Sequence, residues 1–176
     1  TIISRPKKIQ NPNTLTEDVL EHAHNIIKKD VGGIKNIKYY VLLYANGAFL
    51  NSKLIKEAIK KLNKNKSFDS CVGVVNADMF TPIRAKKIGR NNSLKPFTKL
   101  SNFKNITSNR ESAGKAYFME LSIQIIKPKC FEKMNGNQKP FLWLGNKILP
   151  FEKEFGGDID AKWQFTLLEQ WLKKNF

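Results

Sequence analysis

The chain has 176 residues, of which 41% are hydrophobic and 26% charged, so it is long enough for one globular domain with a real core. It carries 31 Lys and Arg against 15 Asp and Glu, a formal net charge of +16. No apolar run reaches transmembrane length and no signal-peptide pattern opens the sequence, so we expect a cytoplasmic protein without a membrane partner. The two cysteines, Cys71 and Cys130, are far apart and without metal-ligand spacing, which indicates neither a disulfide framework nor a zinc site.

The positive charge is one feature of nucleic-acid-binding proteins, because a basic surface gathers polyanions. The excess is mostly lysine and is spread along the chain, without a helix-turn-helix, zinc-finger or aromatic RNA-binding signature. In residues 52–63 the lysines lie opposite an apolar stripe, as on the solvated face of an amphipathic helix. Such a bias also suits phosphate-bearing small substrates, so nucleic-acid binding is the less favoured alternative.

The first predicted element is a helix that begins at Thr16, a plausible N-cap followed by two acidic residues. Lys28-Lys29 lie near its end, and Gly32-Gly33 beyond it indicate a stop. Residues 38–44 are a nearly continuous apolar run, as expected of a strand buried on both faces of a parallel sheet.

A helix at 52–63 and a second buried strand at 70–75 come next, and this succession predicts a βαβ unit with parallel strands. Ligands bind such sheets at the carboxyl ends of the strands. The loops at 45–49 and 76–82 are therefore candidate walls of a site.

The rest of the chain is predicted less regularly. Residues 76–115 are rich in Pro, Gly, Asn and Ser, which predicts long loops or a hairpin insertion. Apolar and polar residues alternate over 119–125, which is typical of a half-exposed strand. A short helix at 129–134 and a short strand at 147–151 follow, and a final helix from near Ala161 is expected to dock its apolar face on the sheet. We predict one α/β domain spanning residues 1–176.

The segment Gly156-Gly157-Asp158-Ile159-Asp160 places two carboxylates on either side of one apolar residue. If it runs extended, Asp158 and Asp160 point to the same side, because side chains alternate along a strand. Two converging hard oxygen ligands suit Mg²⁺ and leave coordination positions for phosphate and water. The structural alternative is that Asp160 caps the last helix and Asp158 is solvated.

The order of several short segments carries a resemblance over nearly the whole chain. They are Ile3-Ser4-Arg5-Pro6, the helix that begins at Thr16, residues 41–49, residues 68–74, Arg110 with Tyr117, and Gly157-Asp158-Ile159-Asp160 before the last helix. Together they resemble the acylneuraminate cytidylyltransferase family, the enzymes that make CMP-activated sialic acid and related nonulosonic acids. The resemblance implies a doubly wound, mostly parallel α/β sheet of the nucleotide-diphospho-sugar transferase type.

The resemblance also implies roles for individual residues and a set of partners. Asp158 and Asp160 would hold Mg²⁺ and serve catalysis, and Arg5 and Thr16 would contact the nucleotide CTP. The nonulosonic sugar acid would be bound by four further residues, Asn46, Lys86, Arg110 and Tyr117. The family also implies a homodimer. Each of these residues has a structural alternative as a cap, turn, loop charge or packing residue.

The family's opening strand and its phosphate-cradling Arg-x-Gly-Ser-Lys loop have no counterpart in this sequence, so the resemblance implies an N-terminally truncated domain. Three interpretations follow. The first is a cytidylyltransferase that transfers CMP from CTP to a sugar acid, incomplete as this fragment. The second is a non-catalytic relative that binds a sugar or a partner, and the third is a basic nucleic-acid-binding domain.

Overall fold

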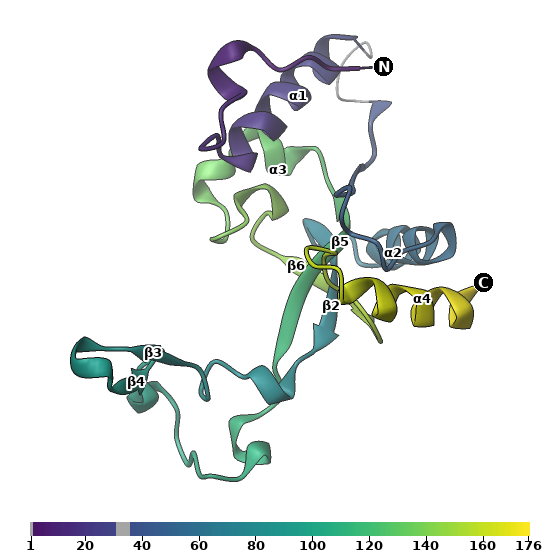
Figure 1. Cartoon of the computed structure of the whole chain (residues 1–176). Helices are drawn as coiled ribbons and strands as arrows, with labels where there is room; N and C mark the ends of the chain where they lie inside the picture. The colour runs from purple at the N-terminus through teal and green to yellow at the C-terminus, as the bar shows by residue number, and fades with distance from the viewer. Residues whose placement is uncertain (1, 31–35) are drawn as a thin grey trace.

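A four-stranded sheet in the order β1-β5-β2-β6 organises the chain. The computed structural model describes residues 2–30 and 36–176, and the strands are β1 (Tyr40–Leu42), β2 (Ser70–Asn76), β5 (Tyr117–Ile126) and β6 (Ile148–Lys153). β2 pairs with β6 in parallel, and β5 pairs antiparallel with both β1 and β2. β1, β2 and β6 therefore share one direction, and β5 runs against them from its place between β1 and β2 (Figure 1). The predicted α/β class with a mostly parallel sheet is confirmed.

The predicted βαβ unit is present with one strand inserted into it. α2 (Ser52–Lys64) connects β1 to β2, which are parallel to each other but separated by β5. The Asn51 side chain accepts a hydrogen bond from the backbone N–H of Leu54 at 2.9 Å, so it caps α2 as N-cap residues do. The loop between β1 and the cap is thereby held at the carboxyl end of β1.

Apolar clusters cover both faces of the sheet, which is the doubly wound arrangement that we predicted. α2 packs Ala58 and Leu62 on one face, against Cys71, Ile123, Ile125, Leu149 and Phe151. The other face is covered by α3 (Lys129–Glu132), η7 (Met134–Gly136) and η8 (Leu142–Leu144), through Cys130, Phe131, Met134, Trp143 and Leu144. Leu20 of α1 (Thr16–Asp30) packs on this second cluster. Burial raises the pKa of both thiols, Cys71 and Cys130, to about 11, so both act as apolar core residues.

The solvent exposure predicted for two of the strands was wrong. The strand predicted at 38–44 as buried on both faces is the three-residue β1, and Val41 is 41% exposed because β1 lies at an edge of the described sheet. β5 was predicted as half-exposed, yet its polar residues Glu120, Ser122 and Gln124 are buried. Gln124 accepts a hydrogen bond from the Trp143 indole at 2.8 Å, so this polar face is covered by protein and not by water.

The C-terminal helix also differs from its prediction. α4 (Gln164–Asn175) begins after Ala161 and buries one residue, Trp171, whose ring lies 6.0 Å from that of Phe49. Trp163, an apolar residue within the helix predicted from near Ala161, is 67% exposed and does not dock on the sheet. α4 is therefore attached through this aromatic contact near the loop that follows β1 and through the exposed ion pair of Lys174 with Glu154, at 2.6 Å.

Residues 77–116 leave the sheet after β2 and return to it at β5, and we call them the arm. The arm contains a hairpin of β3 (Lys86–Ile88) and β4 (Leu94–Pro96), with short helical turns η3 (Asp78–Phe80), η4 (Arg90–Asn92), η5 (Leu100–Asn102) and η6 (Arg110–Ala113). Figure 1 shows the arm extending away from the four-stranded sheet. Its exposed apolar side chains are Phe80, Ile88, Leu94, Phe97, Leu100 and Phe103.

The predicted short helix at 129–134 and short strand at 147–151 are observed as α3 and β6. The Gly32-Gly33 stop signal lies outside the described residues. Within the described residues, no helix is long and apolar enough to cross a membrane.

Truncation of the α2 anchor tests this arrangement. Leu62 is fully buried between α2 and the sheet, so Leu62→Ala should lower the free energy of unfolding by about 2–5 kcal/mol through lost burial and a residual cavity. Urea denaturation followed by circular dichroism measures the change. Leu15→Ala, at an exposed position, is the matched control and should change stability by less than about 0.5 kcal/mol. Equal losses in the two variants would contradict this core.

Candidate functional site

The carboxyl ends of β1 and β6 bring Asn46, Asp158 and Asp160 together. The loop after β6 runs beside the loop after β1, with a bridge between Gly47 and Asp158 and a 2.9 Å hydrogen bond from the Ile159 N–H to the Asn46 carbonyl. The Asn46 side-chain amide donates to Asp160 Oδ1 at 3.0 Å. Three of the predicted site residues thus form one cluster, in which Asn46 lies 112 and 114 positions before the two aspartates, as the edge of a parallel sheet allows.

Asp158 is the electrostatically unusual member of this cluster. Its Oδ1 is buried and has no hydrogen-bond partner among the described residues. Burial raises the pKa of the Asp158 carboxyl, and the nearby charges of Asp160 and Glu120 raise it further. An uncompensated buried oxygen beside two other carboxylates favours the approach of a cation.

The Gln164 side chain holds the other end of this loop. Its carbonyl oxygen accepts hydrogen bonds from the backbone N–H groups of Asp160, at 2.7 Å, and Ala161, at 2.6 Å. The N–H groups that precede α4 are satisfied in this way, so the Asp160 carboxylate is free to interact with Asn46 and not with its own helix. The structural alternative, Asp160 as the cap of the last helix, is not observed.

A buried ion pair between Lys153 and Glu120 lies behind the cluster, and sequence reasoning missed it. Lys153 Nζ is 3.1 Å from Glu120 Oε2, and the two side chains are 3% and 2% exposed. The same ammonium donates to the Phe49 carbonyl at 2.6 Å and to Ser122 Oγ at 2.7 Å. Burial lowers the pKa of Lys153, although the Glu120 charge opposes the shift.

Two glycines make room for the Glu120 side chain. They were the sequence signal that a buried group lies close to the backbone here. A Cβ on Gly73 would lie 1.8 Å from Glu120 Oε1, and a Cβ on Gly156 would lie 2.6 Å from Glu120 Cγ. A glycine inside an apolar strand such as 70–75 often marks a close approach by another group. The pattern of a single strand, however, does not identify the approaching residue.

The cluster offers two carboxylates to a divalent cation. Among the described residues, no group of three or more His, Cys, Asp or Glu side chains could hold a metal ion. Mg²⁺ is commonly held by one or two carboxylates, with water and substrate phosphates completing its coordination. The unpartnered Oδ1 of Asp158 and the carboxylate of Asp160 fit that requirement.

The two predicted nucleotide-binding residues lie in the N-terminal segment. The Arg5 carbonyl accepts a hydrogen bond from the Gln10 side chain, and Thr16 is the first residue of α1. α1 packs beside α3, on the sheet face opposite α2. Among the described residues, no hydrogen bond or ion pair links Arg5 or Thr16 to the carboxylates of Asp158 and Asp160.

The remaining predicted residues belong to the arm or its base. Lys86 lies in β3, Arg110 begins η6, and Tyr117 begins β5. Tyr117 lines a separate cavity of 520 Å³ with residues of the arm, including Phe103 and Ala113. Within one chain the structure does not bring Lys86, Arg110 or Tyr117 into the cluster of Asn46, Asp158 and Asp160.

Comparison with known proteins places this geometry on a known fold. No protein-family model matches the chain, and no curated protein matches it by sequence. The structure is similar to that of CMP:2-keto-3-deoxy-manno-octonic acid synthetase complexed with CTP, with a TM-score of 0.56 at 9% identity, covering 96% of this chain and 72% of that one. It is also similar to a Bacillus anthracis protein assigned as a glucose-1-phosphate thymidylyltransferase, solved with sucrose, with a TM-score of 0.50 at 12% identity, covering 95% and 64%.

Both neighbours support the predicted nucleotide-diphospho-sugar transferase type of fold. At these identities the similarity concerns the fold, so membership of the acylneuraminate family stays a prediction. The chain spans 72% and 64% of the lengths of the two neighbours.

The raised pKa of Asp158 predicts a pH-dependent effect of its substitution. Its pKa lies above the usual 3.8, so the folded state favours the protonated carboxyl, and this contribution to stability is present below 3.8 and lost as pH rises through the raised value. Asp158→Asn should therefore stabilise the metal-free protein increasingly as the pH rises from acid to neutral. Thermal unfolding over this pH range measures the effect. Glu152→Gln, at an exposed position of β6, should show no such trend, and a flat difference for Asp158→Asn would contradict the assignment.

The close approach at Gly73 gives a second test of the site. Gly73→Ala places a methyl group on the Glu120 carboxylate, which must leave Lys153, so the free energy of unfolding should fall by about 1–3 kcal/mol. Gly136→Ala is the control, because its Cβ would meet nothing within 4 Å. Urea denaturation of both variants measures the effect, and an unchanged midpoint for Gly73→Ala would show that Glu120 is not held there.

Proposed function

We propose that this protein acts as a cytidylyltransferase that transfers CMP from CTP to a nonulosonic sugar acid and releases pyrophosphate. The observation that carries the proposal is the cluster of Asn46, Asp158 and Asp160 at the carboxyl ends of β1 and β6. Ligands bind at this edge in open α/β sheets. The similarity to a synthetase that was solved with CTP supports a cytidine nucleotide and a sugar acid as partners.

The residues of the cluster have separable tasks in this reaction. Asp158 and Asp160 would hold Mg²⁺, which when bound supplies positive charge to the phosphate oxygens of CTP. Asn46 orients the Asp160 carboxylate through its amide, and the Lys153–Glu120 pair fixes the backbone behind it. The sugar hydroxyl oxygen forms a bond to the α-phosphorus, the bond to pyrophosphate breaks, and the hydroxyl proton leaves to solvent or a base. Positioning and electrostatics supply most of the rate in such transfers.

Arg5 and Thr16 are proposed to contact the nucleotide, and Lys86, Arg110 and Tyr117 the sugar acid. An arginine suits the sugar carboxylate because its guanidinium can form two parallel hydrogen bonds. Lys86 and Arg110 lie on the arm, which extends away from the sheet (Figure 1), so their role requires a second chain or a different arm position.

A homodimer is part of the proposal. The arm exposes Phe80, Ile88, Leu94 and Phe97, all more than half accessible. Apolar side chains gathered on one projecting segment are typical of an interaction surface. A second copy of this chain would cover them and would bring additional basic residues near the first copy.

Pyrophosphate release tests the activity. The chain is incubated with Mg²⁺, a panel of nonulosonic acids and either CTP or dTTP, since the two structural neighbours differ in nucleotide. We expect release with CTP, and a loss of about 100-fold or more in Asp158→Ala and Asp160→Ala, because each removes charge stabilisation from the transferred phosphate. Glu154→Ala, an exposed carboxylate near the end of β6, should retain activity.

Release that continues unchanged in the Asp158 and Asp160 variants would contradict the assignment of the site. If the folded chain releases no pyrophosphate, these residues alone do not catalyse the transfer. That result would favour the interpretation as a non-catalytic relative. Release with dTTP in place of CTP would contradict the assignment of CTP as the substrate but not the nucleotidyl transfer itself.

A further inference from the structure

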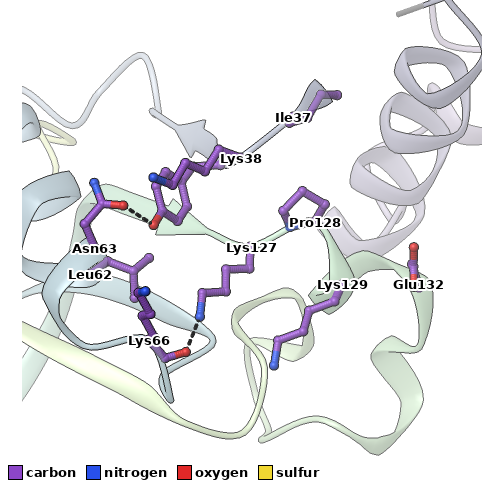
Figure 2. Close-up of a pocket in the computed structure, with 10 residues that line it drawn as sticks. Ile37, Lys38, Leu62, Asn63, Lys66, Lys127, Pro128, Lys129 and Glu132 are labelled. Atoms are coloured by element: carbon purple, nitrogen blue, oxygen red, sulfur yellow. Dashed lines mark hydrogen bonds between the residues drawn. The ribbon is translucent and has the colours of Figure 1, made fainter. Parts of the chain in front are cut away.

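A second pocket lies at the opposite end of the sheet from the Asp158–Asp160 cluster. It has a volume of 480 Å³ and opens where β1 and β2 begin and β5 ends. Its walls come from residues 37–39, from the end of α2 and the turn that follows it, and from residues 127–132 (Figure 2). Sites for small molecules are typically about 300–1,000 Å³ in volume, so this pocket is of sufficient size.

Four lysines line this pocket, against one carboxylate. They are Lys38, Lys66, Lys127 and Lys129, and the carboxylate is Glu132. Lys129 is neutralised, because its Nζ lies 2.5 Å from Asp69 Oδ1. The ion pairs given by the described residues include none for Lys38, Lys66 or Lys127. Three ammonium groups from three separate segments of chain therefore share one pocket without a paired carboxylate.

Asp69, the ion-pair partner of Lys129, is already engaged by other groups of the protein. Asp69 accepts hydrogen bonds from the backbone N–H groups of Asn146, at 3.0 Å, and Lys147, at 2.9 Å, in addition to its pair with Lys129. Burial alone would raise the pKa of Asp69, but Lys129 and the two N–H groups outweigh it and hold the pKa below its usual value. Asp69 thus has no spare capacity to neutralise the other three lysines.

The floor of the pocket is apolar and held in place. Leu62 and Pro128 contribute to it, and the Tyr39 hydroxyl donates to Asn63 Oδ1 at 2.7 Å. Lys38 Nζ lies 5.7 Å from the centre of the Tyr39 ring. Figure 2 shows Lys127 reaching toward Lys66, to whose carbonyl oxygen its Nζ donates at 2.6 Å. The Lys127 ammonium keeps two further N–H donors for a ligand.

We propose that this pocket binds a small polyanion with two or more phosphate groups, such as pyrophosphate or a nucleoside polyphosphate. Lysine ammonium groups bind phosphate as point charges, and three of them from different segments match a ligand with several charged oxygens. The Tyr39 ring and the apolar floor leave room for a nucleoside. A concave pocket lined by several lysines favours a small ligand over an extended nucleic acid, which needs a groove that follows its backbone.

The inference does not rest on the proposed cytidylyltransferase activity, because the pocket and the Asp158 cluster lie at opposite ends of the strands. Binding is therefore measured and not turnover, by isothermal titration of the full chain with pyrophosphate and separately with ATP. Mg²⁺ is omitted and the titration is repeated in Asp158→Ala, which separates the pocket from the Mg²⁺-dependent contribution of the Asp158–Asp160 cluster.

The test compares two double variants of equal charge. The double variant Lys38→Ala with Lys66→Ala removes two ammonium groups from the pocket. The dissociation constants for pyrophosphate and for ATP should both rise by about 10-fold or more, because a hydrogen bond to a charged group contributes more binding free energy than one between neutral groups. Lys99→Ala with Lys173→Ala removes the same charge from exposed positions elsewhere and should change affinity by less than about 2-fold, as screened distant charges do.

An unchanged affinity for pyrophosphate and ATP in Asp158→Ala supports the pocket as a second site. Equal loss of affinity in the two double variants overturns the proposal, because general attraction to a basic protein would then explain the binding. Absence of binding at millimolar pyrophosphate and ATP also overturns it. A single-stranded oligonucleotide that binds more tightly than ATP, and loses that affinity in Lys38→Ala with Lys66→Ala, would assign the pocket to nucleic acid instead.

Discussion

The buried Lys153 ammonium is the interaction on which the candidate site depends. It joins three segments, because it pairs with Glu120 of β5, donates to the Phe49 carbonyl after β1, and itself belongs to β6. Removing a buried ion pair's partner typically costs about 3–5 kcal/mol, since the other charge is left uncompensated. The loop that carries Asp158 begins just beyond Lys153, so the position of the carboxylates is set by a charge that they do not contact through hydrogen bonds.

The same pair determines the electrostatic character of the cluster. Glu120, Asp158 and Asp160 are close enough for both neighbours to raise the pKa of Asp158, while Lys153 supplies one positive charge. Two negative charges remain uncompensated in a partly buried region, which corresponds to the charge of one divalent cation. Glu120 thus acts through the local field and not as a ligand, because its carboxylate is enclosed between Gly73, Gly156 and Lys153.

The features of the fold and the site that could be predicted are those that a short stretch of sequence contains. The continuous apolar run at 70–75 identified β2, and the spacing of Asp158 and Asp160 identified the cluster that the structure joins to Asn46. The alternation over 119–125 was misleading, because a polar side chain inside a protein looks in sequence like one in water. Lys153 and Trp143, which satisfy the polar face of β5, lie at least 19 positions away, so no local pattern contains them.

Four lysines line the pocket at the opposite end of the same sheet from the acidic cluster. α2 directs its capped N-terminus toward the loop of Asn46 and its C-terminus toward the pocket that contains Lys66. A helix C-terminus attracts cations, which explains Lys61 and Lys64 in the last turn. That attraction falls off within one turn, and Lys38 and Lys127 come from other elements. Helix electrostatics therefore favour the lysines in the last turn of α2 and do not account for Lys38 and Lys127 at the pocket.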